Sequence, residues 1–239
     1  MEISDKTHRS FGMLQRTICR WFLKNRLHPI HVFLFHQVSN VFDDTTMKAN
    51  DWTETKQFKA NVIKLKEKYE FISLEEAHRH LLTDIFRYKN YAVLTSDDGW
   101  ESLNNILPWL EEQEIPVTLF INPNYIDGLS YREKTTERYI SRSKMQSYRS
   151  ISVGLHGLEH IRVDKMDENE FRDYVTESVK QTSNISGYIP FWAYTWGKFS
   201  EMNNRILKEF GITPVYIGGE TNINNSEYIE RELLDGKVI

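Results

Sequence analysis

The chain has one cysteine, Cys19, among its 239 residues. A single cysteine excludes an intramolecular disulfide and a cysteine-based zinc cluster, and it fits a reducing compartment. The sequence also lacks an apolar run of the roughly 20 residues that a membrane-spanning helix needs, and it contains no internal repeat, low-complexity tract or Pro/Gly-rich linker. Its content of 40% hydrophobic and 27% charged residues is that of a globular protein.

Several catalytic and binding signatures are missing as well. The sequence has no Gly-x-Ser-x-Gly motif, and the pair Gly218-Gly219 is too short to cradle a phosphate. The net charge of −4 gives no indication of nucleic-acid binding. We therefore expect no nucleic-acid partner, no serine nucleophile of this type and no phosphate-binding loop.

Charge is distributed unevenly along the chain. Residues 1–28 hold six Lys or Arg against two acidic residues, a balance of +4 that leaves −8 for residues 29–239. Residues 9–26 have the pattern of a basic amphipathic helix, which could lie on an anionic membrane surface or pack across the base of a domain. Basic residues at positions 16, 20 and 24 interrupt any signal-peptide core. We expect a cytoplasmic protein, with peripheral contact to the inner membrane face through residues 9–26 as one option.

Short apolar segments alternate with amphipathic helical patterns over the rest of the chain. The expected strands are Ile30–Phe35, Glu70–Ser73, Tyr91–Thr95, Val117–Ile121, Ile151–Leu155, Phe191–Tyr194 and Thr213–Ile217. The expected helices are Lys56–Tyr69, Leu74–Leu82, Ser102–Gln113, Asp167–Ser183 and Glu201–Phe210. This alternation indicates βαβ units and a parallel sheet, either closed into a barrel or open and doubly wound. In both folds, function gathers at the carboxyl ends of the strands.

Polar residues follow most of these expected strands. They are His36, Asp97-Asp98, Asn122, His156 with His160, Thr195-Trp196, and Gly218-Gly219-Glu220. Because the carboxyl ends of parallel strands lie at one edge, we expect most of the chemistry on a single rim.

Two of these segments have the composition of a metal site. Asp97-Asp98-Gly99 ends a strand in two carboxylates, which can serve one site only where the strand curls, and Gly99 permits a curl. His156 and His160, four residues apart, would share one face of a helical turn. Each motif alone has an ordinary explanation, as a solvated turn or a chance histidine pair. Together, a carboxylate and two histidines suit a divalent metal with open positions, and the spare carboxylate can deprotonate a water there.

At these motifs the sequence resembles the polysaccharide deacetylases, also called the NodB-homology or carbohydrate esterase 4 family. Thr95–Gly99 is similar to the family's Thr-Phe-Asp-Asp-Gly, with Ser96 at the aromatic position. The segment from His156 to His160 resembles His-Ser/Thr-x-x-His, with Gly157 at the hydroxyl position. Residues 192–197 and 34–39 resemble the later Phe-Ala-Tyr-Pro-Tyr-Gly and the opening Tyr-His-x-Val-Ser segments. The resemblance covers roughly residues 30–235.

The resemblance implies that residues 29–239 form a catalytic domain with a distorted (β/α)₇ barrel fold. Such a domain removes N-acetyl groups from amino sugars, here in a glycan or a glycan precursor. Asp98, His156 and His160 would hold a divalent metal, commonly Zn²⁺, and Asp97 would be the general base. The backbone N–H near Trp196 would help to bind the developing oxyanion.

Two features of the family are missing from their usual places. The family commonly supplies a late histidine as the acid that protonates the leaving amine, but no histidine follows His160. His36, at the end of the first strand, is the substitute candidate, with a packing role or a substrate contact as the alternative. The arginine that often pairs with the base is also not recognisable, and Arg231 is a weak candidate for it.

Three functions remain open on the sequence. The first is metal-dependent deacetylation of an N-acetylated glycan or glycan precursor. The second is metal-dependent hydrolysis of a small non-sugar amide or imide, and the third is glycan binding by a catalytically impaired barrel. Aromatic residues favour a sugar, and Trp196 is a better stacking candidate than Trp192 or Tyr194, which end a strand as core aromatics do.

Overall fold

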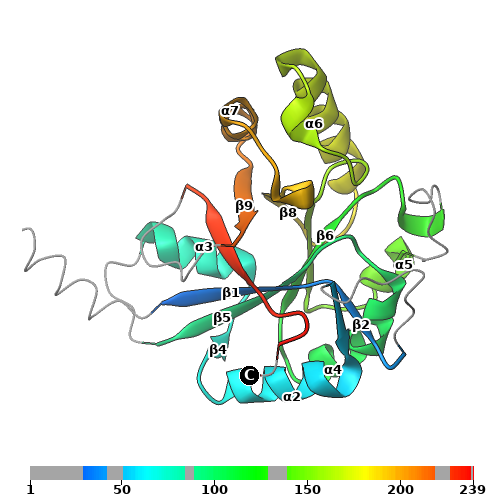
Figure 1. Cartoon of the computed structure of the whole chain (residues 1–239), viewed down its shortest axis with the longest axis vertical. Coiled ribbons are helices and arrows are strands. Elements are labelled where there is room, and N and C mark those ends of the chain that lie inside the picture. Colours follow the sequence, from blue (N-terminus) through cyan, green and yellow to red (C-terminus); the bar gives the residue numbers. More distant parts are fainter. Residues whose placement is uncertain (1–28, 42–50, 84–88, 129–138, 219–226, 238) are drawn as a thin grey trace, which may run out of the picture.

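The computed structural model describes residues 29–41, 51–83, 89–128, 139–218, 227–237 and 239. Within these ranges seven parallel strands close into a barrel, in the order β1-β10-β9-β8-β7-β6-β5 and back to β1 (Figure 1). The closing pair is β1 against β5, in register from Ile30 opposite Tyr91 to Phe35 opposite Ser96. The (β/α)₇ barrel is therefore confirmed, and the open sheet is excluded.

The bounds of the elements are as follows. The barrel strands are β1 (Ile30–Phe35), β5 (Tyr91–Ser96), β6 (Val117–Ile121), β7 (Ile151–Leu155), β8 (Tyr188–Ala193), β9 (Thr213–Ile217) and β10 (Ile229–Leu233). Outside the ring, β4 (Glu70–Phe71) pairs with β5, and β2 (Gln37–Ser39) pairs with β3 (Trp52–Glu54). The α-helices are α2 (Thr55–Lys66), α3 (Leu74–Thr83), α4 (Leu107–Glu112), α5 (Arg142–Met145), α6 (Glu168–Thr182) and α7 (Glu201–Glu209). Short 3-10 helices are η2 (Glu101–Asn105), η3 (Ile126–Gly128), η4 (Val163–Lys165) and η5 (Thr195–Gly197).

No helix in the described part of the chain is long and apolar enough to span a membrane. The basic segment, residues 1–28, lies outside the described residues. Its predicted amphipathic helix and membrane contact therefore stay predictions.

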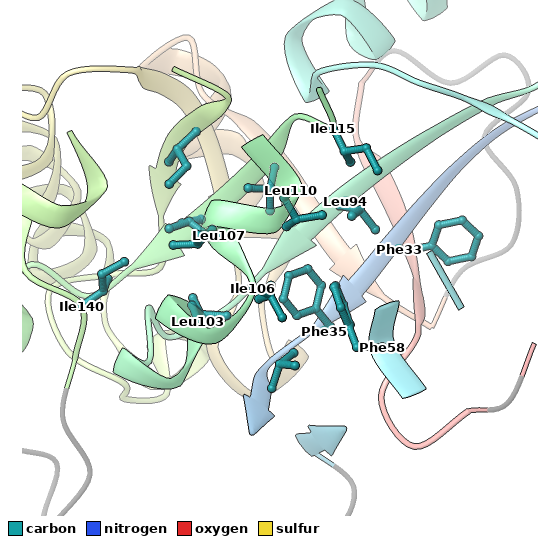
Figure 2. Packing of buried hydrophobic residues seen from close by; sticks show 14 of the residues in the cluster. Phe33, Phe35, Phe58, Leu94, Leu103, Ile106, Leu107, Leu110, Ile115 and Ile140 are labelled. Carbon is teal, nitrogen blue, oxygen red and sulfur yellow. The ribbon is translucent and has the colours of Figure 1, made fainter. Parts of the chain in front are cut away.

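The outer face of the barrel packs against helices on two sides. In Figure 1, α2 and α4 lie along one side and α6 and α7 along the opposite side. Figure 2 shows Phe35 of β1 beside Phe58 of α2, with Phe33 further along the same strand, within a cluster that continues into α4. On the other side, Trp192 and Tyr194 pack with residues of α6 and α7, which confirms that these two aromatics belong to the core.

The interior of the barrel is apolar at one end and polar at the other. Ile30, Val93 and Phe191 belong to an inner cluster that also includes apolar side chains of α3. This helix closes the end of the barrel where the strands begin. The opposite end, where the strands finish, is left for the polar residues of the site.

The barrel contains one strand that the sequence pattern does not predict. The pattern predicts a strand over residues 70–73, but β4 has two residues and stays outside the ring, because Ser73 begins α3 by accepting the N–H of Glu76. The seventh barrel strand is β10 instead. Its sequence, Ile-Glu-Arg-Glu-Leu, lacks the apolar alternation of a strand because its central inward residue is the charged Arg231. This charge is tolerated inside the barrel because it pairs with Asp97.

The predicted helix over residues 102–113 is divided into η2 and α4. Ile106, between the two, has a φ of −125°, and Pro108 lies in the first turn of α4. Proline has no N–H for the preceding turn and its ring clashes with that turn. It is well tolerated at the start of a new helix, which is where the structure places it.

Gly154 in β7 offers a test of the inner packing. A Cβ at this position would lie 2.5 Å from two ring carbons of Phe120 and 3.2 Å from the carbonyl oxygen of Phe191. We expect Gly154→Ala to lower the free energy of unfolding by about 1–3 kcal/mol, the usual cost of overpacking, as measured by urea denaturation. In a Phe120→Leu background the same substitution should cost clearly less. An equal cost in both backgrounds would contradict the packing described here.

Candidate metal and proton-transfer site

The two adjacent carboxylates lie where β5 leaves the barrel. Asp97 continues the inward series of β5, and Asp98 then takes a left-handed backbone conformation with a φ of 69°, followed by Gly99 with a φ of 74°. A non-glycine residue with positive φ is uncommon and is held only by its surroundings. The predicted curl is therefore confirmed, but it begins at Asp98 itself and not only at Gly99. As a result, both carboxylates line one pocket.

Asp98 and the two histidines converge as candidate metal ligands. Asp98 Oδ1 lies 3.5 Å from His156 Nε2 and 3.4 Å from His160 Nε2, and one ligand atom from each residue lies within 4.8 Å of the others. Ligand atoms at about 2.0–2.2 Å around a tetrahedral zinc ion are roughly 3.3–3.6 Å apart. Within the described residues, this is the group of acidic and histidine side chains that could hold a metal ion.

Neighbouring groups orient these ligands toward the pocket. Trp100 Nε1 donates a hydrogen bond of 3.1 Å to Asp98 Oδ2, and His156 Nδ1 lies 2.7 Å from the carbonyl oxygen of Ala193. The His156 Nδ1–H therefore donates to Ala193 and leaves Nε2 as the ligand nitrogen. Asp98 Oδ1 is buried and accepts no hydrogen bond from any described residue. A buried carboxylate oxygen facing two imidazole nitrogens fits a divalent cation.

The imidazoles also control the charge of Asp98. Burial by itself would raise the pKa of this carboxyl, but the close approach of the His156 and His160 imidazoles outweighs burial and holds the pKa well below its usual range. Asp98 is thus a carboxylate at neutral pH, as a metal ligand must be.

The histidine loop, residues 156–160, has no helical turn, so this part of the prediction is wrong. The loop has no regular secondary structure, and its second residue, Gly157, has a φ of 82°. The loop turns because of this left-handed residue, and side-chain amides hold it in place: Asn122 Nδ2 donates to the His156 carbonyl at 2.5 Å and Asn124 Nδ2 donates to Glu159 Oε1 at 3.1 Å. The two histidines converge through loop geometry, not helical periodicity.

Asp97 has an arginine partner, which the sequence suggests only weakly. Arg231 Nη1 and Nη2 donate to the two oxygens of Asp97 at 2.6 and 2.8 Å, and both residues are buried inside the barrel. Burial would raise the pKa of Asp97, but the guanidinium of Arg231 and the nearby His156 lower it below its usual range. Asp97 is therefore ionised and fixed in orientation.

His36 forms a hydrogen-bonded pair with Asp235. His36 Nδ1 lies 2.6 Å from Asp235 Oδ2, and the His36 backbone N–H donates to Oδ1 of the same carboxylate. Burial would lower the pKa of His36, but Asp235, together with Asp97 and Asp98, raises it from 6.5 to about 9. Sequence reasoning missed Asp235, because an Asp-Gly pair near a chain end is typical of a turn. Thr53 Oγ1 lies 3.4 Å from Asp235 Oδ1, and burial raises the pKa of Asp235.

These groups share one pocket of about 340 Å³ at the carboxyl end of the barrel. Its lining includes both aspartates, both metal-site histidines, His36 and Trp196. Trp196 is 49% exposed and has a positive φ of 58°. Its ring packs edge to face against that of His160, with the two ring centroids 4.8 Å apart. The expected convergence on one rim is confirmed for these residues, whereas Gly219 and Glu220 lie outside the described residues.

Comparison with known proteins gives one family match. The family model described as "Polysaccharide deacetylase" matches residues 87–215, more than half of the chain. This range contains the Asp97-Asp98 turn and the histidine loop, but not His36, Arg231 or Asp235. No curated protein matches the sequence.

Solved structures show the same fold at low sequence identity. IcaB from Ammonifex degensii has a TM-score of 0.76 and 17% identity, with 88% of this chain and 94% of that chain covered. The Streptococcus pyogenes deacetylase PplD has a TM-score of 0.72 and 17% identity over 87% and 93% of the two chains. A de-N-acetylase from Aggregatibacter actinomycetemcomitans has a TM-score of 0.73 and 15% identity over 87% and 95%.

Metal binding tests the first part of the site. We expect the purified protein to hold or take up about one equivalent of Zn²⁺, measured by inductively coupled plasma mass spectrometry after removal of free metal. His156→Ala and Asp98→Ala should each abolish tight binding, since each removes one of the three ligands that converge in the pocket. His80→Ala, on α3, is the control and should bind zinc like the wild type. Full zinc occupancy in the Asp98 and His156 variants would show that the metal lies elsewhere.

The raised pKa of His36 predicts how the stability of the metal-free protein depends on pH. Because the folded protein keeps the His36 proton up to about pH 9, its contribution is complete below pH 6.5 and disappears as the pH rises through 9. The shift corresponds to about 3 kcal/mol. Urea unfolding in EDTA should show this loss in the wild type and not in His36→Gln, with His80→Gln as the control. A parallel loss in His36→Gln would assign the pH dependence to other groups.

Proposed function

The chain belongs to the polysaccharide deacetylase family, and we propose that it is a metal-dependent hydrolase that removes N-acetyl groups from an amino-sugar-containing glycan or glycan precursor. The observation that carries this proposal is the convergence of three metal ligands, an arginine-bound aspartate and a carboxylate-bound histidine on one pocket. Amide hydrolysis is helped by a Lewis acid that polarises the carbonyl, a general base and a general acid. The three ligands can hold a metal as the Lewis acid, and the aspartate and the histidine can supply the base and the acid. A bound Zn²⁺ ion, held by Asp98, His156 and His160, would polarise the amide carbonyl and make water more acidic.

Asp97 is the general base of the proposed reaction. Its pair with Arg231 keeps the carboxylate ionised and aims it into the pocket. The same pair makes it a weak base, because its pKa is lowered. A weak base is sufficient here, since a divalent metal lowers the pKa of the water that must lose the proton.

His36 is the general acid that protonates the leaving amine. Its Nδ1 is engaged by Asp235, so Nε2 is the nitrogen that can serve the pocket. With a pKa of about 9, the imidazole is protonated at neutral pH and has a proton to donate. In this proposal the His36–Asp235 pair protonates the leaving amine in place of the late histidine that the sequence lacks. A complete set of catalytic groups favours an active enzyme over a glycan-binding barrel without turnover.

Trp196 is the contact between the pocket and the sugar in this proposal. Its exposed ring at the pocket mouth offers an apolar face to a sugar ring, and its backbone N–H is the candidate donor to the developing oxyanion. A cytoplasmic location, and membrane contact through residues 9–26, belong to the same proposal and would favour a precursor as the substrate.

Asp97→Asn tests both the chemistry and the substrate class. We expect Asp97→Asn to lower kcat for acetate release from an acetamido-sugar panel by about 10²–10⁴, because the amide cannot accept the proton. In the folded variant the zinc content should stay near the wild-type value, since Asp97 is not among the three ligands. Urea unfolding measured in parallel detects the loss of stability from leaving Arg231 without its carboxylate partner. Asp173→Asn, an exposed residue of α6, is the matched control and should keep full activity.

Each of the other two functions has its own result in this assay. Turnover of small amides or imides with no acetate from any acetamido sugar would indicate the amidase. Sugar binding without turnover, unchanged in Asp97→Asn, would indicate a binding protein and overturn the proposal.

A further inference from the structure

A tyrosine of α6 is bound to the backbone of the histidine loop. The hydroxyl of Tyr174 accepts the N–H of Glu159 at 3.0 Å and donates to the carbonyl oxygen of the same residue at 2.9 Å. Glu159 immediately precedes His160. One side chain from a neighbouring helix therefore fixes both backbone polar groups next to a candidate metal ligand.

The position of this hydroxyl explains the glycine in the loop. A Cβ on Gly157 would lie 2.7 Å from Tyr174 Oη and 3.1 Å from Tyr174 Cε1, and Gly157 has a φ of 82°. A side chain at position 157 would therefore collide with the tyrosine and strain the backbone. The motif that this loop resembles has Ser or Thr at the same position. Here a hydroxyl also reaches the loop, but it comes from α6.

We propose that Tyr174 is a positioning residue for the metal site, and that Gly157 is required because it makes room for the tyrosine hydroxyl. The inference rests on the proposed function, because it presupposes the metal. By holding Glu159, Tyr174 sets the path of the chain into His160, whose own N–H donates to Tyr125 Oη at 3.2 Å. Outer groups that fix metal ligands in this way typically affect metal affinity by 10- to 100-fold.

The state of the tyrosine is suited to this task. Burial raises the pKa of Tyr174 to about 12, so the phenol keeps its proton and can donate to the Glu159 carbonyl at any physiological pH. The ring of Tyr174 lies 6.2 Å from that of Trp192, in the cluster between β8 and α6. Packing of the Tyr174 ring in this cluster thus fixes the position of its hydroxyl.

Tyr174→Phe tests the proposal, because it removes the hydroxyl and keeps the ring. We expect the Kd for Zn²⁺, measured by competition with a chromophoric chelator, to rise by about 10- to 100-fold. We also expect the visible absorption bands of the Co²⁺-loaded protein to change, since they report the arrangement of the ligands. Tyr188→Phe, which removes a hydroxyl from a tyrosine packed against the same cluster, should change neither reading.

A double-mutant cycle tests the link to Gly157. Gly157→Ala should weaken Zn²⁺ binding in the wild type and cost less in the Tyr174→Phe background, where the contact at 2.7 Å no longer exists. Unfolding of each metal-free variant is measured in parallel. Weaker Zn²⁺ binding by a stably folded Tyr174→Phe, with a changed Co²⁺ spectrum, supports the positioning role.

Two different results would overturn the inference, and they can be told apart. If wild type and Tyr174→Phe bind Zn²⁺ equally and give the same Co²⁺ spectrum, Tyr174 only stabilises the fold, and the proposed function stands. If the wild type binds neither metal, the metal-dependent function fails and the positioning role fails with it.

Discussion

The buried ion pair between Asp97 and Arg231 is the interaction on which the site depends. Both charges lie inside the barrel, where neither would be stable without the other, because an unpaired buried charge costs several kcal/mol. The pair joins the end of β5 to β10, and the Arg231 guanidinium also lies over the ring of Phe120 at 5.2 Å. The same ion pair therefore links two strands of the closed barrel and orients the proposed base.

Closure of the barrel also brings the two ends of the described chain together. β10 pairs with β1, so that Asp235, just after the last strand, reaches His36, just after the first. The final residues continue along α2, where Asn61 bonds to Lys237 and Ile239, and Figure 1 shows the C-terminus beside this helix. The family match ends before these residues. The proposed acid thus comes from parts of the chain outside the matched segment, and it is assembled only when the ring is complete.

Unusual backbone conformations occur at the pocket, although Glu114 and Asp127 have positive φ elsewhere in the described chain. Asp98 and Trp196 are non-glycine residues with positive φ, and Gly157 adds a third left-handed residue in the histidine loop. Such conformations persist only where the surrounding contacts enforce them. The Trp100 hydrogen bond to Asp98 and the Tyr174 contacts with the loop are contacts of this kind. The groups that hold the candidate ligands and their loops therefore include aromatic side chains as well as charged ones.

The sequence by itself determined the parallel β/α order and the rim of polar residues, and its motifs, through their family resemblance, indicated the candidate ligand set, because strand periodicity and local motifs depend on neighbouring residues. Strands such as Val117–Ile121 and Ile151–Leu155 are read correctly for this reason. Only the tertiary structure decided what depends on distant segments: β10 as the seventh strand, Arg231 as the partner of Asp97, and Asp235 as the partner of His36. These pairs are separated by more than 130 positions in the chain. A charged residue looks like a surface residue in sequence until its partner is known, and the closed barrel supplies that partner.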